Sequence, residues 1–206
     1  MPAKKQNVPK EQTTVKTTDN SSILSFEAPE DWEHWLEQNH LISKGIWLRF
    51  YKKESQVKSV NYQEALDVAL CYGWIDGQVK TYDAQSYLQK FTPRRPKSIW
   101  SKRNIEHVAR LGKDEKMKPA GLKEVESAKT DGRWDVAYDS PSNMTVPDDF
   151  LRELSKNKTS LAFFERLNKS NKYAVTWRLQ TAKKPETREK RMKAILEMLA
   201  RGEKFH

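Results

Sequence analysis

IWLRFYKKESQVKSVNYQEALDVALCYGWIDGQVKTYDAQSYLQKF, residues 46–91, contains segments with the periodicity of strands and one with the pattern of a helix. In IWLRFY, at 46–51, Trp47 and Arg49 alternate with two apolar neighbours, which predicts a β-strand. NYQEALDVALCYG, at 61–73, is apolar on nearly all sides and predicts a buried helix. This stretch therefore predicts a helix packed on a sheet.

Two more strand candidates close the same stretch. GQVKTY at 77–82 and SYLQKF at 86–91 flank a turn-like Asp-Ala pair, which predicts an antiparallel hairpin. Upstream, SILSFEA at 22–28 predicts a strand and PEDWEHWLEQNH at 29–40 a helix that starts with Pro, Glu and Asp. The order β-α-β-α-β-β predicts an α+β fold with a small mixed or antiparallel sheet and two helices.

After the Pro-rich segment TPRRPKS, the chain becomes helical. Ser101 is a candidate N-cap for a helix over 102–111, in which Ile105, Val108 and Ala109 are expected to share the buried face. Further helices are predicted from Pro119, over 148–154, 160–167 and 171–183, and after Pro185; in the last of these Met192, Ile195, Leu196 and Leu199 make the apolar face.

The long irregular stretch 131–147 suggests a domain boundary near Pro141. We expect a disordered tail at 1–21, an α+β domain with two trailing helices at 22–140, and a helical C-terminal domain at 141–206.

Composition limits the class of protein. The 206 residues carry a net charge of +10 and include seven each of Trp, Tyr and Phe, which is the composition of a globular basic protein. Cys71 is the only cysteine, so no disulfide forms within the chain. There is neither an apolar leader nor a run of about 18 apolar residues, so we expect a cytoplasmic protein without a membrane span.

The inventory of catalytic motifs is thin. The four histidines are isolated, and H-E-x-x-H, C-x-x-C, G-x-S-x-G, P-loop and G-x-G-x-x-G patterns are absent. We therefore expect no metal and no cofactor, and the sequence leans against an enzyme.

One segment concentrates positive charge. Residues 93–118 hold nine Lys or Arg against three Asp or Glu, and the cations are interleaved with aromatic rings. This pattern predicts a ridge that binds nucleic acid or another polyanion. The alternative is that the cations are solvated and the tryptophan is a packing residue. The ridge candidates are Arg94, Arg95, Lys97, Trp100, Lys102 and Arg103.

A second candidate site is acidic. Asp67 lies within the apolar helix, and a buried carboxylate must be paired or hydrogen-bonded. In the structural interpretation, Asp67 caps a neighbouring strand or pairs with Arg49 or Lys80. In the functional interpretation, several polar residues line a pocket beside a tryptophan. The pocket candidates are Glu64, Asp67, Trp74, Asp76, Gln78 and Lys80.

Four strings resemble one known family. They are Y-x-E-A-L-D-x-A-L-C-Y-G-W-I-D-G-Q at 62–78, F-T-P-R-R-P-K-S-x-W-S-x-x-N at 91–104, P-A-G-L-x-E-V-E-x-A-K-x-D-G-R-W at 119–134 and W-R-L-x-T-A-K-K-P-E-T-R-x-x-R at 177–191. Together they resemble the YdeI/OmpD-associated (bacteriocin-protection) family over roughly residues 23–206.

The resemblance implies a link to resistance against cationic antimicrobial peptides, with no established catalytic residues. Members have been described as periplasmic, from which this sequence departs because it shows no export signal. Three functions follow as hypotheses: a non-enzymatic stress or protection protein that binds an anionic partner through the ridge, a small-molecule enzyme or ligand-binding domain around Asp67, Trp74 and Asp76, and a module whose C-terminal helices dock a protein partner. The oligomeric state stays open.

Overall fold

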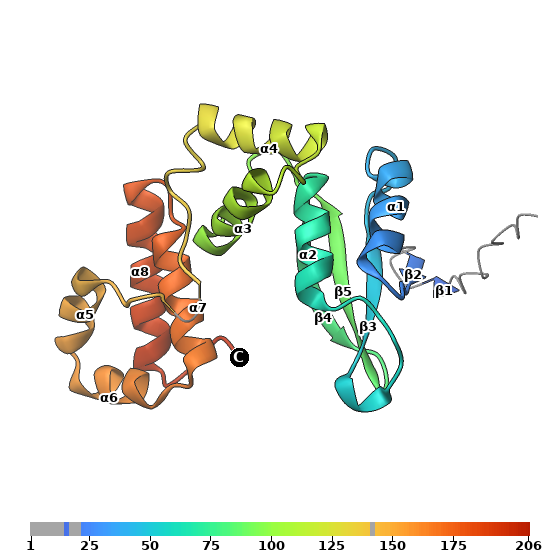
Figure 1. Cartoon of the computed structure of the whole chain (residues 1–206). Coiled ribbons are helices and arrows are strands. Elements are labelled where there is room, and N and C mark those ends of the chain that lie inside the picture. Colours follow the sequence, from blue (N-terminus) through green and yellow to red (C-terminus); the bar gives the residue numbers. More distant parts are fainter. Residues whose placement is uncertain (1–14, 17–21, 141–142) are drawn as a thin grey trace, which may run out of the picture. The chain divides into compact units, whose positions relative to one another are not determined.

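The computed structural model describes residues 15–16, 22–140 and 143–206 (Figure 1). Of the expected tail at 1–21, only Val15–Lys16 belong to the described residues, and they form a short strand. The chain divides into two compact units: unit 1 comprises Met1–Ser98 and His107–Asp131, and unit 2 comprises Ile99–Glu106 and Gly132–His206. Pro141 lies outside the described residues, so the domain boundary near it stays a prediction.

Unit 1 is built around a mixed sheet. Its strands run in the order β1-β2-β3-β5-β4, where β2 pairs parallel to β3 and the other neighbours are antiparallel. The predicted α+β class and the order β-α-β-α-β-β are thereby confirmed. The elements are β1 Val15–Lys16, β2 Ser22–Leu24, α1 Pro29–Asn39, β3 Ile46–Tyr51, the 3-10 helix η1 Lys53–Ser55, α2 Tyr62–Cys71, β4 Trp74–Thr81 and β5 Ser86–Pro93.

Local sequence explains where α2 begins and ends. Asn61 caps the helix, because its side chain accepts a hydrogen bond from the Glu64 backbone N–H at 3.0 Å. The Glu64 side chain in turn accepts a hydrogen bond from the Asn61 backbone N–H at 2.9 Å. This reciprocal pair satisfies two backbone donors at the start of the helix. Gly73 follows the helix with φ +73°, a conformation that glycine adopts without steric cost.

Helices α1 and α2 cover the same face of the sheet. Trp32 of α1 meets Phe91 of β5 with ring centroids 5.8 Å apart, and Tyr62 of α2 meets Phe50 of β3 at 6.4 Å. Phe50 and Phe91 are fully buried, whereas the residues that alternate with them along β3 and β5 point to the opposite face. This opposite face is where the candidate site lies.

Helices α3 Lys102–Lys113 and α4 Pro119–Thr130 follow the sheet. Ser101 caps α3 as predicted, since its hydroxyl accepts a hydrogen bond from the Asn104 backbone N–H at 3.1 Å. The predicted buried face was partly wrong: Ala109 is exposed, whereas Asn104, Val108 and Leu111 are buried. These buried residues follow the spacing i, i+4, i+7 and begin with the polar Asn104. A search for apolar periodicity does not include such a residue.

Unit 2 contains four further helices with a hydrophobic core of their own. They are α5 Asp148–Ser155, α6 Lys158–Arg166, α7 Lys169–Gln180 and α8 Pro185–Ala200. The predicted apolar face of α8 is confirmed, because Ile195 and Leu199 are buried in this core and Met192 and Leu196 pack against it. The other buried members are Phe150, Leu154, Phe164, Val175 and Leu179. Among the described residues, no helix combines the length and apolar character that crossing a bilayer requires.

Candidate functional site

The predicted basic ridge is divided between the two units. Its unit 1 part contains one buried cation: Arg94 is 7% exposed, and its backbone N–H donates to the Gly73 carbonyl at 3.0 Å. Arg94 is therefore not a surface group that a partner can reach. Arg95 and Lys97 are exposed, so these two keep the potential to meet an anion.

The ridge residues of unit 2 are also partly engaged. Trp100 is 1% exposed and packs against Trp134 with ring centroids 5.1 Å apart, so it is a buried packing residue of unit 2. Lys102 forms an ion pair with Asp139 at 2.7 Å, and hydrogen bonding to Lys102 lowers the pKa of that carboxyl. Arg103 is exposed.

Asp67 is paired, but not with the predicted residues. His107 Nδ1 lies 2.8 Å from Asp67 Oδ1, and an Arg110 nitrogen lies 2.7 and 2.6 Å from the two carboxylate oxygens. The predicted partners Arg49 and Lys80 were wrong, because the compensating groups come from α3, 40 residues further along the chain. Asp67 thus ties α2 to the unit 1 part of α3.

The other acidic-site candidates have separate surroundings. Glu64 belongs to the α2 cap, and Trp74 is buried with its indole N–H donating to the His40 carbonyl at 3.2 Å. Asp76 accepts a hydrogen bond from the Tyr62 hydroxyl at 2.9 Å. Gln78 and Lys80 are exposed on β4. The six residues are distributed over these places rather than gathered around one hollow.

Cys71 lies one helical turn after Asp67 in α2 and is buried. Burial raises the pKa of its thiol to about 11, and the nearby Glu33 and Asp67 carboxylates act in the same direction. At neutral pH the thiol is protonated, so Cys71 is not an activated nucleophile.

The face of the sheet opposite α1 and α2 gathers cations and aromatic rings. Residues paired directly across neighbouring strands share a face, so the register defines rows of side chains across β3, β5 and β4. We call this surface the basic–aromatic face. Its rows are Trp47 and Lys90; Arg49, Leu88 and Lys80; and Tyr51, Ser86 and Tyr82, the last placed by its backbone hydrogen bond to Ser86 and by its contact with Arg49.

Aromatic rings hold the cations of this face in place. The ammonium nitrogens of Lys80 and Lys90 lie 4.3 and 5.0 Å from the centroid of the Trp47 ring. Such cation–π contacts are each worth about 0.5–1 kcal/mol at exposed sites. Trp47 itself is 1% exposed and belongs to a buried cluster with Ile23 and Leu88, whereas Lys80 is exposed.

Arg49 occupies the middle of the face between two tyrosines. Its guanidinium carbon lies 4.4 Å from the Tyr51 ring centroid and 4.7 Å from that of Tyr82. One guanidinium nitrogen pairs with Asp83 in the β4–β5 turn at 2.6 Å, and Nε donates to the Ser86 hydroxyl at 3.0 Å. Arg49 is therefore fixed in position by four neighbours.

The sequence contains a partial signal for this face. The alternation that predicted the strand at 46–51 already placed Trp47 and Arg49 together, and Tyr51 continues the same period. Lys80 and Lys90 could not be added, because that requires the pairing order and register of β3, β5 and β4.

Two families match different parts of the chain. Residues 24–124 match a domain of unknown function (DUF8412), and residues 143–202 match the family described as "Bacteriocin-protection, YdeI or OmpD-Associated". The resemblance noted over residues 23–206 thus narrows for the second family to the C-terminal part, which contains the motif at 177–191. No curated protein and no solved structure matches the chain. A YdeI/OmpD-associated domain is therefore present at residues 143–202.

Proposed function

We propose that this protein is a non-enzymatic protection or stress protein that binds an anionic polymer, such as nucleic acid, through the basic–aromatic face. One observation carries the proposal: Lys80 and Lys90 project from adjacent strands onto one face beside Arg49, which is paired with Asp83, and aromatic rings hold all three cations there. The description of the family matched at 143–202 supplies the biological setting, protection against bacteriocins.

The geometry favours contacts to phosphates over reading of bases. Trp47 is buried, so it is not available as a platform for a base. Tyr82 is 40% exposed and is the ring of this face on which a base can stack. Binding should therefore tolerate any sequence and depend strongly on salt.

Ordering of the cations strengthens this argument. A free lysine loses roughly 1.5–2 kcal/mol of side-chain entropy when it is fixed. Because the contact with the Trp47 ring already restricts the Lys80 side chain, Lys80 loses less side-chain entropy when it binds an anion. Lys80 makes no ion pair within the described residues, so its charge is not neutralised there.

The test is a fluorescence-anisotropy titration of a labelled single-stranded oligonucleotide at several salt concentrations. The wild-type affinity should fall with salt, with a slope of roughly 0.7 per phosphate contact on a single strand. Lys80→Glu should weaken binding at every salt concentration and make the slope shallower by about 1. Circular dichroism should show an unchanged fold, since Lys80 is exposed.

A matched control is the double variant Lys158→Glu/Lys169→Glu. Both residues are exposed first positions of helices, where a glutamate is favoured by the helix dipole, so the control should fold and carries a larger charge change. Equal loss of binding in the control would show that net charge alone acts. Loss in Arg95→Glu/Lys97→Glu with normal binding by Lys80→Glu would move the site to the loop after β5.

The proposal that the C-terminal helices dock a protein has less support. A docking site of this kind would present an exposed apolar patch on residues 147–182. The large apolar side chains exposed in the described chain are Leu41, Ile42, Val57, Val79, Tyr82, Leu122 and Val136, and none of these lies in that range.

A further inference from the structure

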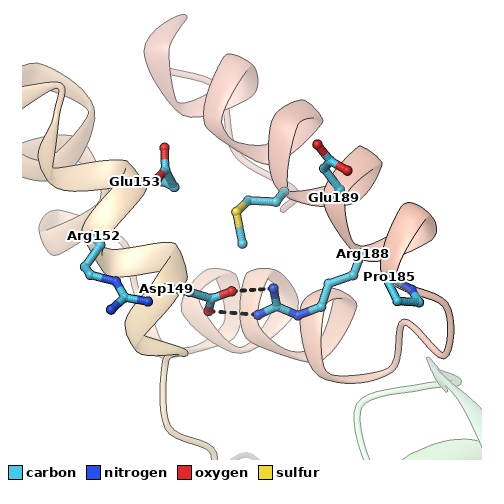
Figure 2. Close-up of a pocket in the computed structure, with 7 residues that line it drawn as sticks. Asp149, Arg152, Glu153, Pro185, Arg188 and Glu189 are labelled. Carbon is cyan, nitrogen blue, oxygen red and sulfur yellow. Dashed lines mark hydrogen bonds and ion pairs between the residues drawn. The ribbon is translucent and has the colours of Figure 1, made fainter.

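A hollow of about 410 Å³ opens between α5 and the first turns of α8, entirely within unit 2 (Figure 2). Pockets of roughly 300–1,000 Å³ are the size range of small-molecule sites. This one uses none of the residues of the basic–aromatic face. It is lined by Asp149, Arg152, Glu153, Pro185, Arg188, Glu189 and Met192.

The base of the hollow is an internally neutralised ion pair. Arg188 donates two parallel hydrogen bonds to the Asp149 carboxylate, at 2.5 and 2.9 Å, and the Phe150 backbone N–H donates to the same carboxylate at 2.9 Å. The Arg188 hydrogen bond is the main cause of the lowered pKa of Asp149. This pair joins α5 to α8 and fixes the floor, so neither member is the natural anchor for a ligand.

Two charges of opposite sign remain on the walls. Arg152 of α5 and Glu189 of α8 lie on opposite sides of the hollow in Figure 2, and both are exposed. Neither forms an ion pair within the described residues. Glu153, by contrast, forms an ion pair with Lys156, whose ammonium nitrogen lies 2.8 Å from the carboxylate. Met192 adds a partly buried apolar surface.

We propose that this hollow binds a small zwitterion, an apolar amino acid or dipeptide, with its carboxylate on Arg152, its ammonium group on Glu189 and its side chain on Met192. A simple anion would be attracted by Arg152 but repelled by Glu189. A simple cation would be attracted by Glu189 but repelled by Arg152. A ligand with both charges is attracted by both walls. Guanidinium groups bind carboxylates through two parallel hydrogen bonds, which suits Arg152 to this role.

The probes are leucine and leucyl-leucine, titrated into the ¹⁵N-labelled full chain while the backbone amide shifts are followed. We expect saturable shifts in α5 and α8 with a Kd on the order of 1 mM, which corresponds to about 4 kcal/mol. The two probes differ in the separation of their charges, so the tighter one reports the length of ligand that the walls accept.

Charge removal on the protein and on the ligand can be combined. Arg152→Ala and Glu189→Gln should each weaken binding of the better probe by about tenfold. N-acetylation of that probe removes its ammonium group and leaves a simple anion, so the acetylated form should bind weakly to the wild type and more tightly to Glu189→Gln, in which the repelling charge is gone. Lys158→Ala, at an exposed residue outside the hollow's lining, is the control and should bind normally.

Three results overturn the proposal: no saturable shift in α5 or α8 with either probe, wild-type affinity in both Arg152→Ala and Glu189→Gln, or equal binding of leucine, acetate and an alkylamine. None of these outcomes bears on polyanion binding by unit 1, because the two sites share no residue.

Discussion

Gly121 of α4 is in close contact with the end of α2. A Cβ built at this position would meet the Cys71 carbonyl oxygen at 2.2 Å and that of Leu70 at 2.7 Å, and both are backbone atoms that cannot rotate away. Gly121→Ala should therefore separate the two helices and lower the free energy of unfolding by about 1–3 kcal/mol, the usual cost of overpacking. Urea denaturation followed by circular dichroism measures this difference.

Gly112 provides the matched control. It lies in α3 with nothing within 4 Å of a Cβ at its position, so alanine fits and favours the helix by up to about 1 kcal/mol. Equal stability of the two variants would contradict the close α2–α4 packing.

Single residues also show where sequence reasoning stops. That Asp67 needed a partner followed from its place in an apolar helix, and the structure supplies His107 and Arg110. Which residues would compensate it could not be predicted, since the choice depends on how α3 packs against α2. Arg94 illustrates the same limit: a basic run looks solvated in sequence, yet this member is buried.

At the scale of elements, prediction succeeded where local chemistry decides. β3, α2 and α8 were found from strand alternation, an apolar helix with a glycine stop, and a Pro-initiated amphipathic pattern. The candidate site was harder to predict from the sequence, because Arg49, Lys80 and Lys90 come together only through the strand order β3-β5-β4. Register between distant strands is a tertiary property that local periodicity does not encode.

The α5–α8 contact through Asp149 and Arg188 should depend on pH. Because the folded-state pKa of Asp149 is lowered, the pair contributes stability above the unfolded carboxyl pKa of about 3.9, and this contribution is lost as pH falls through the folded-state value. Asp149→Asn should therefore destabilise the protein more at pH 6 than at acidic pH. Chemical denaturation at a series of pH values measures the difference.

Asp148→Asn removes the same charge from the neighbouring position, which forms no ion pair within the described residues. Its effect on stability should be small at each pH. A constant difference between Asp149→Asn and the wild type across the pH range would contradict the assignment.

At the scale of the whole molecule, the two units differ in how they are built. Unit 1 buries Trp32, Phe50 and Phe91 between a mixed sheet and two helices, whereas the core of unit 2 comes from helices alone. The family matches follow the same division, at 24–124 and 143–202. We propose polyanion binding for unit 1 and zwitterion binding for unit 2, so each activity should be removable by substitution without changing the residues of the other site.

Because each unit has its own core, a core substitution in one unit should reduce hydrogen-exchange protection in that unit alone. Phe150 is fully buried in the core of unit 2, packed edge-on against Phe164 at 5.6 Å, so Phe150→Ala should cost about 3–5 kcal/mol. Hydrogen exchange should then accelerate in α5 to α8, while peptides from β3, β5 and α2 keep their protection. Gly121→Ala should give the reverse pattern. If either substitution exposed the amides of both units to the same extent, the molecule would unfold as one cooperative structure, and the division of functions between two independent cores would lose its physical basis.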